Sequence, residues 1–256
     1  MMMQTLSNWI NPQYLNSSYF EQLQETVKSK PDIKYLVLDN FFKEDKLEEL
    51  IKQHQTLEFS EYLDRRSDTD SELLPYDGSV VFANQEIHIG SDLFFNPEWH
   101  EYLVRLVNSN YQLNHPCHTE IKLRYHRPYA NGFWIHTDSF SRKLVVICYF
   151  NKNWKYEDGG MLQLWRVDEE CSESSFKINN INPESRMDFL TTHKRIQTDC
   201  PGGGFADNKV HDLVLIDQIL PIYNRVFICD LSNDLSYHSV TPSNGKERTG
   251  FVQWLM

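Results

Sequence analysis

The sequence has 256 residues, of which 40% are apolar and 13% aromatic, so it can bury a sizeable core as one large β-domain with helical additions. Its formal net charge of -11 and its pI near 5.3 argue against an extended nucleic-acid-binding surface, because phosphate contacts need clustered Lys and Arg. No apolar run approaches the length that crosses a bilayer, which excludes a membrane-spanning class.

The N-terminal residues MMMQTLSNWI (1–10) have neither the basic n-region nor the apolar h-region of a secretion signal, so we expect a cytoplasmic protein. The cysteines form no C-x-x-C pair and are odd in number, which favours reduced thiols over a disulfide framework. Cys148 and Cys229 lie in apolar runs, where a free thiol packs as a small hydrophobe. The remaining cysteines are Cys117, Cys171 and Cys200.

The first part of the chain, residues 1–115, is expected to support the core and to contribute part of a substrate lid. YLVLDNFF (35–42) favours a short strand, and KEDKLEELIKQHQ (43–55) predicts a helix with one apolar face and acidic residues in its first turn. Residues 60–80 are charged and lack a sustained period, which indicates an exposed loop. Residues 97–111 begin with a proline and predict a second helix.

The remainder, residues 116–256, predicts a core made mainly of β-strands, interrupted by an insertion at about 167–210. Many short strands without alternating helices point to an antiparallel sandwich or barrel. The predicted fold class is therefore mainly β with flanking helices. The predicted strands are TEIKLRYH (119–126), GFWIHTD (132–138), KLVVICYF (143–150), MLQLWRV (161–167), DLVLI (212–216), NRVFICDL (224–231) and GFVQWLM (250–256).

A possible metal motif lies in WIHTDSF (134–140), where His136 and Asp138 would share one face of a strand. H-x-D also arises by chance, and a His-Asp pair is often an ordinary surface hydrogen bond. A second cluster supplies His238 and, ten residues later, Arg248. Two histidines and one carboxylate suit non-haem Fe(II) and oxygen chemistry, and an arginine on the next strand can hold a dicarboxylate through paired hydrogen bonds.

Three ordered stretches resemble the Fe(II)- and 2-oxoglutarate-dependent dioxygenases, in particular the prolyl-4-hydroxylase-like branch. They are LRYHRPYANGFWIHTDSFSRKLVVICYFN (123–151), DGGMLQLW (158–165) and NRVFICDLSNDLSYHSVTPSNGKERTGFVQWLM (224–256). DNFFKEDKLEELI (39–51) also resembles the strand-helix opening of that branch. The resemblance implies that residues 116–256 form a double-stranded β-helix, the jelly roll of cupin-like proteins.

The resemblance also implies the cofactors and the residues that hold them. The implied iron ligands are His136, Asp138 and His238. Arg248 would pair with the distal carboxylate of 2-oxoglutarate. Candidate hydroxyl donors to that carboxylate are Tyr125, Tyr149 and Thr249, although either tyrosine could be a core aromatic and strand alternation could turn Thr249 away. O₂ is the oxidant, 2-oxoglutarate is a cosubstrate, and ascorbate is a candidate reductant.

The implied reaction is hydroxylation of an unactivated C–H bond, with release of succinate and CO₂. The substrate classes left open are a small molecule such as a natural product, an amino acid, and a peptidyl residue of the prolyl type, including a specific proline of a ribosomal-type protein. Two other classes remain. One is a β-helix that binds a ligand without catalysis, and the other is a hydrolase with zinc on the same residues. Arg248 favours the oxygenase, because a hydrolase needs no dicarboxylate anchor there.

Overall fold

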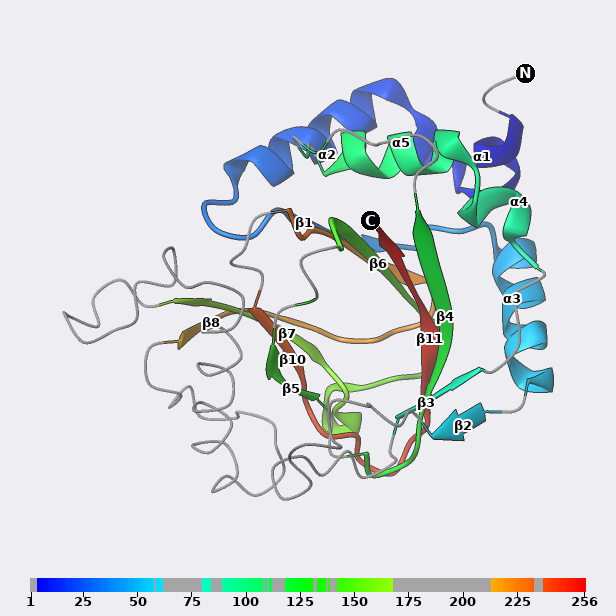
Figure 1. Ribbon diagram of the computed structural model, residues 1–256, viewed down its shortest axis with the longest axis vertical. Helices are drawn as coiled ribbons and strands as arrows, with labels where there is room; N and C mark the ends of the chain where they lie inside the picture. Colours follow the sequence, from blue (N-terminus) through cyan, green and yellow to red (C-terminus); the bar gives the residue numbers. More distant parts are fainter. Residues whose placement is uncertain are drawn as a thin grey trace.

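The computed structural model describes residues 4–57, 59–61, 80–83, 89–107, 109, 111, 118–130, 133–136, 138, 142–167, 213–232 and 237–256 (Figure 1). Of residues 59–61, 80–83, 133–136, 167 and 213 it describes the backbone alone. The predicted insertion at 167–210 and most of the predicted loop at 60–80 thus lie outside the described residues.

Two antiparallel sheets form the centre of the fold. The larger sheet has seven strands in the order β1-β9-β6-β11-β4-β3-β2, and the smaller has four in the order β5-β10-β7-β8. The strands of the larger sheet are β1 (Tyr35–Asp39), β2 (Phe59–Glu61), β3 (Val80–Ala83), β4 (Thr119–His126), β6 (Leu144–Tyr149), β9 (Arg225–Asp230) and β11 (Arg248–Leu255). Those of the smaller sheet are β5 (Phe133–His136), β7 (Leu162–Val167), β8 (Leu213–Ile219) and β10 (Tyr237–Val240).

From β4 to β11 the chain passes back and forth between the sheets, except that β7 and β8 follow each other in the smaller sheet. Strands β4, β6, β9 and β11 lie side by side in the larger sheet, and β5, β7, β8 and β10 make up the smaller one. All the strand pairs are antiparallel. This winding is that of a jelly roll, the double-stranded β-helix, so the predicted fold class is confirmed.

Helices cover one face of the larger sheet, and the smaller sheet lies on the other side (Figure 1). The helices are α1 (Gln4–Trp9), α2 (Ser17–Ser29), α3 (Glu44–Thr56), α4 (Ser91–Phe94) and α5 (Pro97–Leu106), with 3-10 turns η1 (Pro12–Leu15) and η3 (Tyr156–Asp158). Both predicted helices are confirmed. The second ends at Leu106, earlier than predicted, and it begins at a proline after Asn96, whose side chain accepts a hydrogen bond from the Glu98 backbone at 2.9 Å.

The larger sheet is apolar on both faces because it separates two cores. On β6, Val146 and Cys148 pack toward the helices, whereas Val145 and Tyr149 pack between the sheets. This alternation follows from the two-residue period of a strand. Alternate residues of the strands in the larger sheet therefore line the space between the two sheets, and the site described below lies there.

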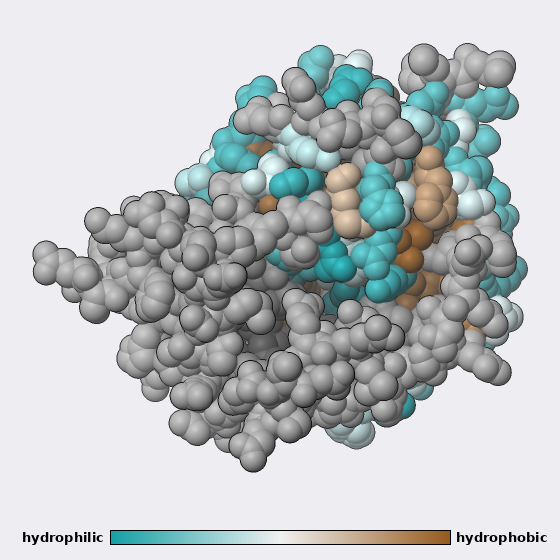
Figure 2. All heavy atoms as spheres, in the orientation of Figure 1, coloured by the Kyte–Doolittle hydropathy of each residue, from teal (hydrophilic) through white to brown (hydrophobic). Residues whose placement is uncertain are grey.

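On the face shown in Figure 2, most of the described residues are hydrophilic, and a small group of apolar ones lies beside them. Cys148 and Cys229 are buried free thiols, as predicted, and burial raises the pKa of each well above its ordinary value. Within the described ranges, no helix has the length and apolar character to cross a membrane.

Candidate active site

The backbone register brings the predicted metal ligands to one place. Strands β5 and β10 are neighbours, and His136 is paired with His238 across them. Residues opposed in this way have Cα atoms about 4.5–5.5 Å apart. Asp138 lies close by, because its Oδ2 is 4.0 Å from Nε2 of His238. Two imidazole-bearing positions and one carboxylate thus meet at the end of the smaller sheet.

One detail of the prediction needs correction, since β5 ends at His136 and does not include Asp138. Asp138 therefore reaches His238 from the segment after the strand and not through alternation along it. The register between β10 and β5 also shifts between His238 and Val240, where β5 uses one more residue than β10. Such a bulge bends a strand and often lies next to an active site.

The Asp138 carboxylate is mostly buried and has two described donors. Its side chain is 10% exposed. Oδ1 accepts a hydrogen bond from Nη1 of Arg142 at 3.0 Å, and Oδ2 accepts one from Nε1 of Trp254 at 3.0 Å. The carboxylate is therefore held in one orientation before any metal binds.

Arg248 begins β11 and lies inside the molecule, 4% exposed. Its Nη1 is 2.8 Å from Nε2 of His126, the residue opposite it on β4. Burial, followed by the charges of Arg248 and Arg124, lowers the pKa of His126 well below its ordinary value, so the ring is neutral. Since a guanidinium only donates, His126 accepts this hydrogen bond. No carboxylate of the described chain forms an ion pair with Arg248, and its Nε has no hydrogen-bond partner there.

Tyr149 lies next to Arg248 in the interior. Its ring centroid is 5.0 Å from the guanidinium carbon of Arg248. The side chain is 1% exposed, and no described residue accepts a hydrogen bond from its hydroxyl. Burial raises the pKa of Tyr149, and Arg248 partly opposes that rise. A buried cation and a buried hydroxyl, each with an unused donor, fit the carboxylate of a ligand such as 2-oxoglutarate.

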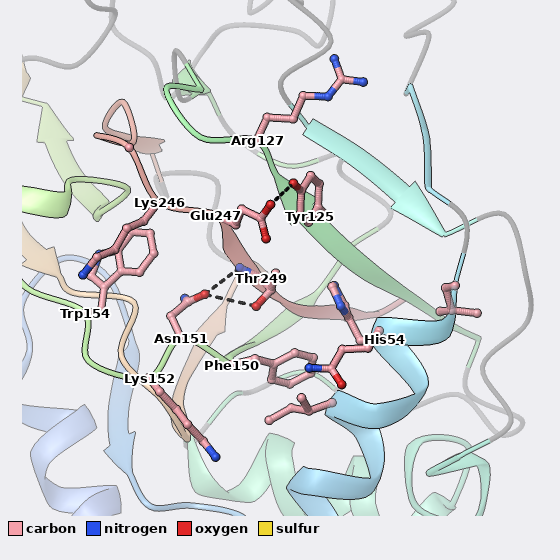
Figure 3. Close-up of a pocket in the computed structure, with 14 residues that line it drawn as sticks. His54, Tyr125, Arg127, Phe150, Asn151, Lys152, Trp154, Lys246, Glu247 and Thr249 are labelled. Carbon is pink, nitrogen blue, oxygen red and sulfur yellow. Dashed lines mark hydrogen bonds between the residues drawn. The ribbon is translucent and has the colours of Figure 1, made fainter.

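The structure does not bring Tyr125 or Thr249 to Arg248. These two residues are opposite each other on β4 and β11, and strand alternation turns them to the helix side of the larger sheet. Figure 3 shows both in a pocket of about 780 Å³ beside α3. There the Tyr125 hydroxyl donates to Oε1 of Glu247 at 2.6 Å, and Oγ1 of Thr249 donates to Oδ1 of Asn151 at 3.2 Å.

The sequence reading did not assign His126, Arg142 or Trp254 to the site. Alternation in TEIKLRYH was the available signal for His126, because it turns His126 and Tyr125 to opposite faces of β4. No local signal joins Trp254 to Asp138, which are 116 residues apart in the chain.

Comparisons with known proteins agree with this geometry. Residues 124–196 match the family model of the 2OG-Fe(II) oxygenase superfamily. A prolyl-4-hydroxylase of Pseudomonas putida is 15% identical with a TM-score of 0.52, over 91% of this chain and 98% of that one. A prolyl hydroxylase of Trichoplax adhaerens, solved with a hypoxia inducible factor peptide fragment, is 16% identical with a TM-score of 0.50, over 94% and 93%. No curated protein sequence matches the chain.

The fold is shared beyond the prolyl hydroxylases. HygX of Streptomyces hygroscopicus, solved with nickel, 2-oxoglutarate and hygromycin B, is 9% identical with a TM-score of 0.50, over 91% of this chain and 85% of that one. At such identities these structures establish the fold, and the family model adds a sequence match. The match over residues 124–196 therefore confirms the resemblance to the 2OG-Fe(II) oxygenase superfamily, and prolyl hydroxylases are among the proteins that share the fold.

Proposed function

We propose that this protein is an oxygenase dependent on Fe(II) and 2-oxoglutarate, which hydroxylates an unactivated C–H bond of an amino-acid, peptidyl or natural-product substrate. The reaction consumes the substrate, 2-oxoglutarate and O₂, and it yields the hydroxylated product, succinate and CO₂. The protein is thus an oxidoreductase whose oxidant is O₂ and whose electrons come from both the substrate and 2-oxoglutarate.

The observation that carries the proposal is the state of Arg248. A buried cation without a counter-ion costs several kcal/mol, so a fold that keeps one gains when an anion binds beside it. Arg248 is 4% exposed and has no ion-pair partner in the described chain, and the Tyr149 hydroxyl next to it has an unused donor. A zinc hydrolase on the same ligands has no use for such an anion site.

The roles of the residues follow from their chemistry. His136, Asp138 and His238 would hold Fe(II), for which two imidazoles and one carboxylate are a suitable donor set. Arg248 and Tyr149 would bind the distal carboxylate of 2-oxoglutarate, and neutral His126 would orient the Arg248 guanidinium. When bound, iron and 2-oxoglutarate together supply the activation of O₂. The apolar residues between the sheets would exclude bulk water from the reacting groups.

Two substrate classes have support among proteins of the same fold. The solved structures from Pseudomonas putida and Trichoplax adhaerens are prolyl hydroxylases, which favours a proline of a protein or peptide. HygX was solved with hygromycin B, a small molecule, which keeps a natural product open. The prolyl substrate is our first candidate, because the family resemblance in the sequence points to the same branch.

The first test is anaerobic addition of Fe(II) and 2-oxoglutarate to the purified protein. We expect a weak charge-transfer band in the visible range. His136→Ala should abolish this band, and Arg248→Ala should weaken it at a given 2-oxoglutarate concentration. Arg127→Ala is the matched control, because Arg127 is exposed and lines the pocket on the helix side of the larger sheet. It should leave the band unchanged.

Substrate screening follows if the band appears. Release of succinate above the uncoupled background would be compared for proline-containing peptides, free amino acids and small natural products. If no band forms, or if the protein binds zinc tightly and Fe(II) not at all, the oxygenase proposal is wrong.

A further inference from the structure

Asp138 belongs to a network of charged side chains between the two sheets. Arg142 donates to Oδ1 of Asp138, and its Nη2 donates to Oε2 of Glu120 at 3.1 Å. Lys122 forms an ion pair with the other oxygen of Glu120, with Nζ 2.7 Å from Oε1. Burial alone would raise the pKa of Glu120, but Lys122 and Arg142 outweigh it, and the net shift is downward. Glu120 is therefore an ionised partner that holds Arg142 from the side away from Asp138.

Trp254 holds both members of the Arg142–Asp138 pair. The guanidinium carbon of Arg142 is 3.8 Å from the centroid of the Trp254 ring, a close cation–π contact. The indole N–H of the same residue donates to Oδ2 of Asp138. Trp254 is 3% exposed and is paired with Glu120 across β11 and β4, so its place is set by the sheet. The Trp254 ring therefore contacts both the Arg142 guanidinium and one oxygen of the Asp138 carboxylate.

We propose that Arg142 and Trp254 are positioning residues that set the orientation of the Asp138 carboxylate for metal binding. This inference rests on the proposed function, in which Asp138 is a metal ligand. An ionised carboxylate has about four lone-pair sites, so an oxygen that accepts one hydrogen bond can still bind a metal. Without the two donors the carboxylate would lose two of the contacts that orient it, and ordering it on metal binding would then cost free energy. Loss of such outer partners typically weakens metal binding about 10- to 100-fold.

Trp254 and Arg142 contact different oxygens of the Asp138 carboxylate. Oδ2 is the oxygen that lies 4.0 Å from Nε2 of His238, another predicted ligand, and Trp254 donates a hydrogen bond to it. Oδ1 faces Arg142. We therefore assign Oδ2 to the metal and Oδ1 to Arg142, which holds the carboxylate in the orientation that presents Oδ2.

The test uses single variants of the full chain and the metals Fe(II) and Co(II) under anaerobic conditions. Trp254→Phe removes the indole N–H but keeps a ring under Arg142. Arg142→Met removes the cation, and Arg142→Lys restores it. Trp99→Phe is the matched control, because its buried indole N–H also donates to one oxygen, Oε1 of Gln253, at 2.9 Å, on the helix side of the larger sheet.

Three quantities would be measured for each variant: the metal dissociation constant by calorimetry, the d–d spectrum of bound Co(II), and the unfolding temperature without metal. Trp254→Phe and Arg142→Met should weaken metal binding about 10- to 100-fold and alter the Co(II) spectrum. Arg142→Lys should bind metal more tightly than Arg142→Met. Trp99→Phe should keep the unmutated dissociation constant and spectrum, even where it lowers the unfolding temperature.

The inference is wrong if Trp254→Phe leaves the dissociation constant and the Co(II) spectrum unchanged, or if Trp99→Phe weakens metal binding equally. Trp254→Phe decides the matter even where Arg142→Met does not fold. If the unmutated protein binds neither metal, the proposed function itself fails. If it binds metal and forms the charge-transfer band while the variants behave like it, only the positioning role is lost.

Discussion

Replacing Tyr149 with phenylalanine removes one buried hydroxyl whose hydrogen has no described acceptor, and we expect two effects of opposite sign. A hydrogen bond to a charged group contributes about 1.5–3 kcal/mol, so loss of the donor to the 2-oxoglutarate carboxylate should weaken cosubstrate binding about 10- to 100-fold. The same hydroxyl is buried without a described partner in the free protein, and an unsatisfied buried polar group costs about 1–3 kcal/mol. The cosubstrate-free variant should therefore be as stable as the unmutated protein, or more stable.

The assay is an anaerobic titration of the Fe(II) protein with 2-oxoglutarate, followed through the charge-transfer band, together with thermal unfolding of the cosubstrate-free protein. Tyr125→Phe is the matched control, because its hydroxyl is engaged by Glu247 on the other face of the sheet. Unchanged 2-oxoglutarate binding by Tyr149→Phe would refute the reasoning. A loss confined to Tyr125→Phe would instead support the earlier assignment of Tyr125.

Three further substitutions test the packing and electrostatics around the site. His126→Gln should flatten the pH dependence of stability. Burial lowers the pKa of His126, so below about pH 6.5 the unfolded chain binds a proton that the folded protein does not bind. The free energy of unfolding of the unmutated protein then falls by up to about 1.4 kcal/mol per pH unit. Urea unfolding at pH 7.5 and 5.5 checks this, and an undiminished slope in the variant would contradict it. Phe251→Ala should lower the free energy of unfolding by about 3–5 kcal/mol, because the ring is 1% exposed and packs against Phe42, Phe94 and Phe150. A loss below about 1 kcal/mol in urea unfolding would show that the core repacks. Gly250→Ala should destabilise the folded protein by about 1–3 kcal/mol and weaken 2-oxoglutarate binding. A Cβ at this position would lie 2.2 Å from the Cys148 carbonyl oxygen and push β11 away from β6. Unfolding and binding curves like those of the unmutated protein would contradict this clash.

The sequence was sufficient for the long elements of the fold. Mainly apolar runs predicted strands β6, β9 and β11, and the alternation of polar and apolar residues in TEIKLRYH predicted β4. Strand β10 (Tyr237–Val240) was not predicted, because it has four residues, two of them polar, and shows no apolar period. It becomes a strand through its pairing with β5 and β7, which is a property of the folded chain and not of the segment.

The candidate site could be predicted in part. The positions of His136, Asp138 and His238 followed from motif order, and the register and the 4.0 Å contact support them, although their role as metal ligands stays a prediction. Alternation shows that Arg248 and Thr249 face opposite ways, but only the packed structure decides which face is the interior. For the same reason the sequence left both Tyr125 and Tyr149 as candidates. Contacts between distant segments, such as Trp254 with Asp138, depend on the packing of both sheets.

Strand β11 carries both the predicted anchor of the cosubstrate and the indole that holds Asp138. Arg248 and Trp254 are six residues apart on it, which corresponds to about 20 Å at a rise of 3.4 Å per residue. Because β11 is hydrogen-bonded to β4 and β6 on its two sides, this separation cannot stretch, and loss or gain of a single residue would turn Trp254 toward the helices. Insertions and deletions within β11 should therefore be the least tolerated in this chain, and changes of substrate preference should arise elsewhere.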